Sequence, residues 1–152
     1  MFSLKTFFFG NLTEGKIDEQ VNIAHITFYG NNKADKVYVN GVESGISWVF
    51  VDVLTKLNKE GLNTIKFVWK KKLTSINYIF YNCPQIISID LSKFDSSSLI
   101  GASYVFTNSG VENITMPNFD ASKITGYKDV FTGCNNLEFI DITNYKGIDI
   151  FK

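Results

Sequence analysis

The residues with the most reactive side chains in this sequence are one histidine, His25, and two cysteines, Cys83 and Cys134. A Ser-His-Asp or Cys-His centre would need the histidine beside a nucleophile. His25 instead lies in a strand-like run, Ile23 to Thr27. One histidine and two distant cysteines also do not make a metal site, and the sequence has no Gly-rich phosphate loop. We therefore expect no catalytic residue, no metal and no cofactor, and a protein that is not an enzyme.

The two cysteines hold the same position of a repeated segment, two copies apart. Strands of neighbouring copies stack about 4.8 Å apart, which places Cys83 and Cys134 roughly 10 Å from each other. A disulfide needs Cα atoms within about 7 Å. The spacing predicts two free, buried thiols.

The repeat extends from Ile79 to Ile150 and recurs every 25 or 26 residues. Each copy carries the spacing apolar-x-x-apolar-x-apolar, whose last two positions have the period of a strand with one buried face. Aromatic residues recur at two further positions. A fixed period of this length is typical of a repeat architecture. The apolar columns are Ile86, Val111, Leu137; Ile89, Ile114, Ile140; Leu91, Met116, Ile142; Phe80, Phe106, Phe131; and Phe94, Phe119, Tyr145.

A turn-like run rich in Ser and Asp follows each strand, as in residues 92–98 and 117–123. Such residues cap helical turns, so short helical pieces are expected over about 98–106 and 122–131. One copy cannot bury its apolar side alone, whereas stacked copies can. The expected fold class is an α/β repeat, a leucine-rich-repeat-like solenoid with short parallel strands and short helices, preceded by a small β-rich N-terminal cap.

Residues 79–99, which read IFYNCPQIISIDLSKFDSSSL, resemble the BspA-like leucine-rich repeats, whose motif is close to MFxxCxxLxSIDLSxFDTSxVTxM. The second copy has Ser109 in place of the cysteine, and the third keeps Cys134 but has Tyr145-Lys146 in place of Phe-Asp. The resemblance covers roughly the second half of the chain. It implies a non-enzymatic protein-interaction or adhesion module of bacterial or protist surfaces, with a protein or a cell-surface glycan as partner.

We expect two segments, a β-rich cap over residues 1–61 and a solenoid of about four coils over residues 62–152. In the cap, Asn40-Gly41 is a strong hairpin signal. Phe7-Phe8-Phe9 suits a first strand or an arm that reaches a partner. Residues 46–57 fit a strand or a helix equally well. The first and last coils are atypical, and the first keeps only the spacing Leu62-x-x-Ile65-x-Phe67.

The charge balance excludes several partners. The chain has 15 basic and 15 acidic residues and a net charge of zero, so no overall field favours nucleic acid. Lys70-Lys71-Lys72 is expected to be a solvated turn. No run of about 18 apolar residues is present, so we expect no membrane insertion. The opening is too short for a signal peptide. Cell surface, virion and cytoplasm all stay open as locations.

Strand residues that point away from the core of stacked coils form columns across an open, flat sheet face. Such faces are common binding surfaces in repeat proteins. Lys66 is expected beside Asp90, and Phe139 is an apolar ring among small polar neighbours. The candidate partner-binding residues are Lys66, Ser88, Asp90, Asn113, Thr115, Phe139 and Asp141.

The alternative function is a structural or assembly subunit, such as a virion or appendage decoration protein. It would use the N-terminal arm and an open C-terminal coil for self-assembly. Unpaired strand edge and apolar surface at such an end are features that proteins normally cover. Either the last coil caps itself with Tyr145, Ile148, Ile150 and Phe151, or its open face meets a partner.

Overall fold

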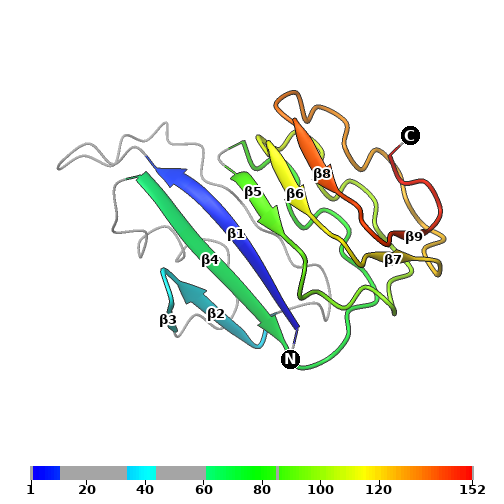
Figure 1. Cartoon of the computed structure of the whole chain (residues 1–152), viewed down its shortest axis with the longest axis horizontal. Coiled ribbons are helices and arrows are strands. Elements are labelled where there is room, and N and C mark those ends of the chain that lie inside the picture. Colours follow the sequence, from blue (N-terminus) through cyan, green and yellow to red (C-terminus); the bar gives the residue numbers. More distant parts are fainter. Residues whose placement is uncertain (1, 11–33, 44–60, 85, 152) are drawn as a thin grey trace.

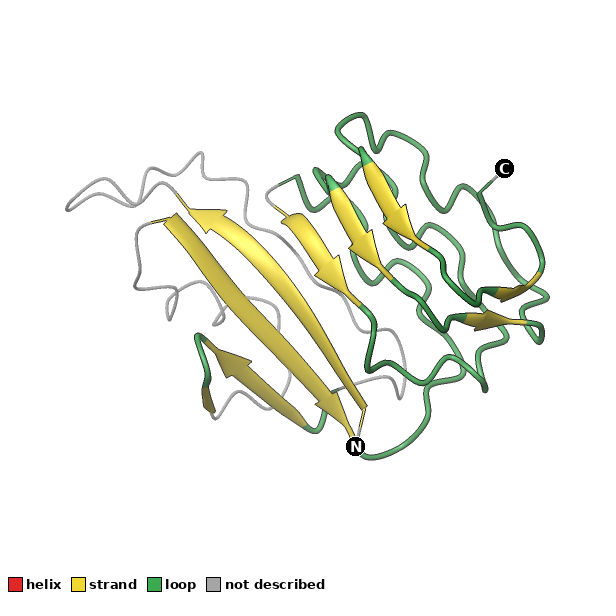
Figure 2. Ribbon diagram, viewed as in Figure 1, coloured by secondary structure: helices red, strands yellow, loops and turns green. Residues whose placement is uncertain are grey.

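The computed structural model describes residues 2–10, 34–43, 61–84 and 86–151. The expectations for His25 and for residues 46–57 lie outside this part. Within it the chain forms strands, turns and bends and contains no helix (Figure 2). The strands are β1 (Phe2–Gly10), β2 (Lys36–Val39), β3 (Val42–Glu43), β4 (Gly61–Trp69), β5 (Ile86–Asp90), β6 (Asn113–Thr115), β7 (Asp120–Ala121), β8 (Phe139–Asp141) and β9 (Lys146–Gly147).

Seven of these strands form one mixed sheet in the order β3-β2-β4-β1-β5-β6-β8 (Figure 1). β1 runs antiparallel to both of its neighbours, β4 and β5. β5, β6 and β8 are parallel and lie side by side. β7 and β9 form a second, two-stranded parallel sheet. Strands from the first 61 residues and strands from the repeats therefore share one sheet.

The expected α/β solenoid is wrong on two counts. The segments 98–106 and 122–131 are not helical in the described structure. In the first, the N–H groups of Ala102, Tyr104 and Phe106 bond to another copy, and Tyr104 has the left-handed φ of 56°. In the second, Asp129 has the left-handed φ of 49°. The insertion of antiparallel β1 also interrupts the parallel sheet that a solenoid requires. The chain is instead a strand-rich protein with a mixed sheet.

Backbone bonds between copies replace the expected helical bonds. Every second N–H in one copy donates to a carbonyl of the next copy, at 2.8–3.0 Å, and all of these donors point the same way. We call this arrangement the N–H ladder. It joins Ile76, Tyr78, Phe80 and Asn82 to Gly101, Ser103, Val105 and Thr107, and joins Ala102, Tyr104, Phe106 and Asn108 to Gly126, Lys128, Val130 and Thr132.

Left-handed backbone recurs at fixed positions of the ladder. Tyr78, Tyr104 and Asp129 have φ values of 60°, 56° and 49°. Asn82 and Asn108 have φ values of 52° and 56°, and Gly133, at the equivalent position of the third copy, has a φ of 75°. The copies therefore repeat a backbone shape that no regular helix or strand has.

Side chains of the copies form the aromatic columns that the sequence predicts, and Phe151 extends one of them beyond the prediction. Phe80, Phe106, Phe131 and Phe151 stack in turn with ring centroids 5.7, 5.3 and 5.5 Å apart. In a second column Phe94, Phe119 and Tyr145 stack at 6.5 and 6.3 Å. The inward strand residues Ile89 and Ile114 are fully buried. The apolar spacing thus correctly identifies the core positions of the first two copies, whereas in the third copy Ile140 is only partly buried and Ile142 is exposed.

Two expectations for the N-terminal segment are settled by strand pairing. The Asn40-Gly41 hairpin is confirmed, since β2 and β3 pair across it and both turn residues have positive φ. Residues 2–10 are a strand with neighbours on both sides, and not an arm. Among the residues described, no helix is long or apolar enough to cross a membrane.

Candidate binding surface

The predicted columns on the open sheet face are confirmed for the three parallel strands. Ser88 lies opposite Asn113, which lies opposite Phe139. In the next column Asp90 lies opposite Thr115, which lies opposite Asp141. The structure therefore brings together six of the seven candidate residues, each contributed by β5, β6 or β8.

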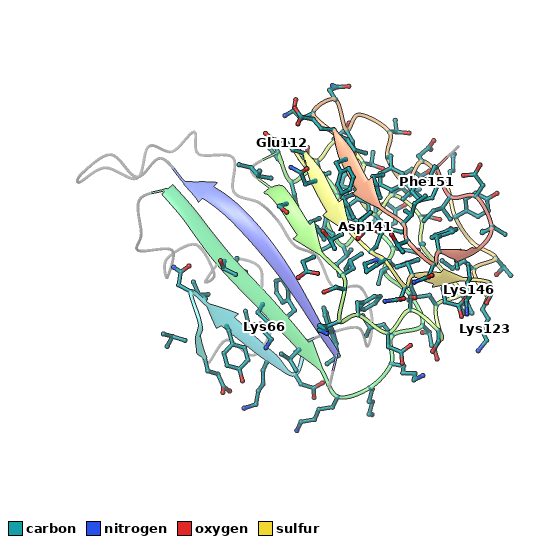
Figure 3. The ribbon with its side chains drawn as sticks, in the orientation of Figure 1. Lys66, Glu112, Lys123, Asp141, Lys146 and Phe151 are labelled. Carbon is teal, nitrogen blue, oxygen red and sulfur yellow. The ribbon has the colours of Figure 1, made fainter. Side chains whose placement is uncertain are left out.

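Lys66 does not join them. β1 lies between β4 and β5, and Lys5 is the Cα partner of both Lys66 and Asp90. The predicted neighbour pair of Lys66 and Asp90 is therefore wrong. The Lys66 ammonium instead lies 5.6 Å from the centre of the Tyr38 ring. Figure 3 shows Lys66 on the far side of β1 from Asp141.

The carboxylates of the face close the ends of their own strands. Asp90 Oδ1 accepts a hydrogen bond from the Ser92 N–H at 2.8 Å, and Asp141 Oδ1 accepts one from the Thr143 N–H at 3.0 Å. Bonds from the backbone and side chain of Thr143 lower the pKa of Asp141. Carboxylates bonded in this way are turn-forming groups and do not converge on one point.

The outer edge of β8 is open, because no strand of the described residues pairs with it. The Phe139 N–H donates to the Glu112 carbonyl at 3.1 Å, and the Asp141 carbonyl accepts from the Met116 N–H at 2.9 Å. Both groups therefore face β6. By the alternation of a strand, the N–H and C=O of Ile140 face the outer edge.

Exposed apolar side chains accompany this edge. Phe139 is 58% exposed on the sheet face, and Ile142 just beyond the strand is 43% exposed. Most large apolar residues of the first two copies are buried. Apolar surface beside unpaired strand edge is the combination that favours contact with another chain.

The N–H ladder also ends in the third copy. The groups equivalent to its donors are the N–H groups of Tyr127, Asp129, Phe131 and Gly133, and none has an acceptor in the part of the chain described. The third copy therefore presents a row of N–H groups without acceptors among the described residues, whereas the equivalent N–H groups of the first two copies are hydrogen-bonded. We call this row, together with the outer edge of β8, the donor end.

The last residues cover part of the donor end. Phe151 stacks on Phe131 and lies 5.5 Å from the Tyr145 ring, and Ile150 is buried. The Tyr145 hydroxyl donates to the Ile148 carbonyl. Phe131, Leu137 and Ile140 nevertheless stay only partly buried. The last coil was expected either to cap itself or to leave an open face for a partner. Each alternative holds in part, because the final residues cover apolar side chains of the third copy while the outer edge of β8 stays unpaired among the described residues.

A polar hollow of about 540 Å³ lies beside the turns that follow β5, β6 and β8. Its polar residues come from three successive copies, so no single segment of the sequence indicates it. The recurrence of Asp and Asn in these turns was the available signal. The polar residues are Asp95, Ser96 and Ser97 of the first copy, Asn118 and Asp120 of the second, and Asn144 and Lys146 of the third.

Cys83 and Cys134 are not joined by a disulfide, as predicted. Cys83 is fully buried, and its burial raises the pKa of the thiol to about 12. Cys134 is only half-buried and donates to the Phe106 carbonyl at 2.9 Å, so the prediction of burial holds for one thiol of the two. Within the described ranges, no group of three or more His, Cys, Asp and Glu residues could hold a metal ion.

The geometry thus offers three surfaces: the sheet face, the donor end and the polar hollow. Comparisons were made with models of protein families, with curated proteins and with solved structures. None of the three finds a match to this chain.

Proposed function

We propose that the chain is a non-enzymatic protein-interaction module that binds an extended segment of another protein along the outer edge of β8. The observation that carries the proposal is the outward-facing N–H and C=O of Ile140 next to Phe139, whose side chain is 58% exposed. Adding a strand to an open edge gives affinity through backbone hydrogen bonds and specificity through side chains.

The residues of β8 support this use of the edge. Proteins usually protect an open edge with Lys, Pro or a bulge. The segment Leu137 to Thr143 contains neither lysine nor proline, and its only charged residues are Glu138 and Asp141. Phe139 adds an aromatic ring of the kind that dominates binding energy at protein interfaces. The edge is therefore open both to backbone pairing and to an apolar anchor.

The surrounding face supports binding without catalysis. Ser88, Asn113 and Thr115 are small and half-buried, which leaves the sheet flat beside Phe139. The carboxylates of Asp90 and Asp141 accept bonds from their own turns. A flat face with engaged carboxylates suits a partner strand or loop better than a substrate, which would need a cleft.

Amide hydrogen exchange tests the proposal directly. In the free chain the Ile140 amide should exchange much faster than the Phe139 amide, which is bonded to Glu112. Peptides selected from a random display library for binding to the chain should slow exchange at Ile140. Phe139→Asp should abolish their binding, whereas Ile100→Asp, at an apolar residue 55% exposed outside the sheet, should not. Selected peptides that leave Ile140 exchange unchanged would contradict the proposal.

A structural or assembly subunit is the second candidate, and the same open edge favours it. Two copies can pair β8 with β8 antiparallel about a two-fold axis, which closes both edges. The arm expected for such a subunit is not available, because residues 2–10 form β1. Light scattering over a concentration series separates the candidates. A mass that stays at 17.2 kDa excludes self-assembly, and a dimer that Phe139→Asp dissociates supports it.

A further inference from the structure

The polar hollow is built by the same turn in three successive copies. Its lining residues follow the carboxyl ends of the parallel strands β5, β6 and β8. Figure 2 shows these strand ends and the chain that follows them, and Figure 3 labels Lys146. A volume of about 540 Å³ lies in the range of small-molecule sites. The hollow does not include the β8 edge, so it constitutes a second, separate surface.

Hydrogen bonds hold the walls in place before any ligand arrives. Asp95 Oδ1 accepts from the Ser97 N–H, and Asp120 Oδ1 accepts from the Ser122 N–H, both at 2.9 Å. The hydroxyl of Ser96, which is 3% exposed, accepts from the Asp120 N–H at 2.7 Å and ties two copies together. Because these bonds fix the turns, a ligand would meet a preorganised site.

The aromatic part of the wall is fixed in the same way. Phe94 is half-buried and stacks on Phe119 with centroids 6.5 Å apart, and its ring lies nearly perpendicular to that of Trp69 with centroids 6.2 Å apart. It therefore supplies a stationary apolar contact among polar groups.

The charges around the hollow are of both signs. Lys72 lies 2.8 Å from Asp95 and neutralises that carboxylate. Hydrogen bonds from Ser122 lower the pKa of Asp120, and the positive charges of Lys146 and Lys123 act in the same direction. Both carboxylates of the hollow thus have ammonium groups near them. A charged ligand of either sign would meet repulsion as well as attraction at such a site.

We infer that the hollow binds a neutral carbohydrate. Sugar hydroxyls both donate and accept hydrogen bonds, and the walls offer both kinds of partner: the ammonium of Lys146, the amides of Asn118 and Asn144, and the carboxylate of Asp120. Phe94 provides a contact for the C–H surface of a sugar ring. This inference does not depend on the β8 edge being a protein-binding site.

Titration of the ¹⁵N-labelled chain with glucose, galactose, mannose and N-acetylglucosamine, followed by amide shifts, tests the inference. At least one sugar should shift amides in residues 95–97, 118–120 and 144–146, with no change at Ile140. Lys146→Ala and Asn118→Ala should each weaken binding about tenfold or more. Lys128→Ala removes an exposed lysine that does not line the hollow and should leave binding unchanged.

Three results would overturn the inference. The first is that none of the four sugars shifts the lining amides of the wild type. The second is that Lys146→Ala, with an otherwise unchanged spectrum, binds as tightly as the wild type. The third is that inorganic phosphate or sialic acid shifts these amides while the neutral sugars do not. Because Ile140 exchange is measured separately, failure here leaves the test of the β8 edge intact.

Discussion

The ring of Phe106 stacks on the ring of Phe131, with centroids 5.3 Å apart and 19° between the planes. Phe80 stacks on the other side of Phe106 at 5.7 Å. Phe106 is 3% exposed and is the middle ring of the three copies. The column therefore couples the copies to one another through their side chains, as the N–H ladder couples their backbones.

Removing the middle ring should destabilise the whole chain. We expect Phe106→Ala to lower the free energy of unfolding by about 3–5 kcal/mol, because it deletes a buried aromatic side chain and leaves a cavity. Urea denaturation followed by tryptophan fluorescence measures this. Phe139→Ala is the matched control, since that ring is 58% exposed, and its effect should stay within about 0.5 kcal/mol. Equal effects at the two positions would contradict the observed packing.

Close backbone approach makes Gly110 intolerant of a side chain. A Cβ there would lie 2.0 Å from the carbonyl oxygen of Pro84 in the preceding copy. Gly110→Ala should therefore lower the free energy of unfolding by about 1–3 kcal/mol or more. At Gly126 the nearest atom to a Cβ is the Ile100 carbonyl oxygen at 3.8 Å, so Gly126→Ala should be tolerated. Thermal unfolding of the two variants side by side decides whether the copies approach as closely as described.

The ion pair of Lys72 and Asp95 predicts loss of stability in acid. The hydrogen bond from Lys72 and then that from Ser97 lower the pKa of Asp95 from 3.8 to about 2. The unfolded chain therefore binds this proton at a higher pH than the folded chain. The stabilisation is present above about pH 4 and is lost as the pH falls toward 2.

NMR titration of the Asp95 side-chain carbon measures this pKa. Lys72→Met removes the largest cause, so the Asp95 pKa should rise toward 3.8, and the acid-induced loss of stability should shrink. Lys71→Met, at an exposed neighbouring lysine, should leave the Asp95 pKa unchanged. An Asp95 pKa that is the same in wild type and Lys72→Met would show that the ion pair does not form in solution.

The two thiols should react at different rates. Burial raises the pKa of Cys83 to about 12, so almost no thiolate is present at neutral pH. Cys134 is half-buried, and burial raises its pKa as well, but its partial exposure gives a reagent access. With a disulfide reagent at neutral pH, Cys134 should be modified slowly and Cys83 only on unfolding. The Cys134→Ser variant should then show almost no reaction until denaturant is added, and rapid reaction of that variant would disprove the burial of Cys83.

Part of this architecture follows from local spacing. Successive residues of a strand point to opposite sides of the sheet. This alternation places Ile89, Ile114 and Ile140 on one side of β5, β6 and β8 and Asn113 and Phe139 on the other, and it fixes the register of the three strands. The recurrence of phenylalanine likewise identifies the stacked columns. Periodicity carries this information because each copy meets its neighbour at equivalent positions.

Other parts depend on contacts that local sequence does not encode. The place of β1 between β4 and β5 is decided by pairing over long sequence separations, and this placement separates Lys66 from Asp90. The helix expectation failed because donors such as the Tyr104 N–H find carbonyls in the next copy, which outweighs the capping signal of Ser and Asp. The hollow was missed because its polar residues come from three turns that only the fold brings together.

The N–H ladder gives the repeats an electrical polarity. Each of its four hydrogen-bond chains aligns three peptide groups, and every peptide carries a dipole of roughly 3.5 D. The aligned dipoles add, so positive partial charge collects at the N–H groups of Tyr127, Asp129, Phe131 and Gly133, although the chain as a whole is uncharged. Carbonyl oxygens and carboxylates of an approaching molecule are attracted to the third copy, and ammonium groups are repelled from it. The orientation of approach is thereby biased before the β8 edge makes any contact, and added salt weakens that bias.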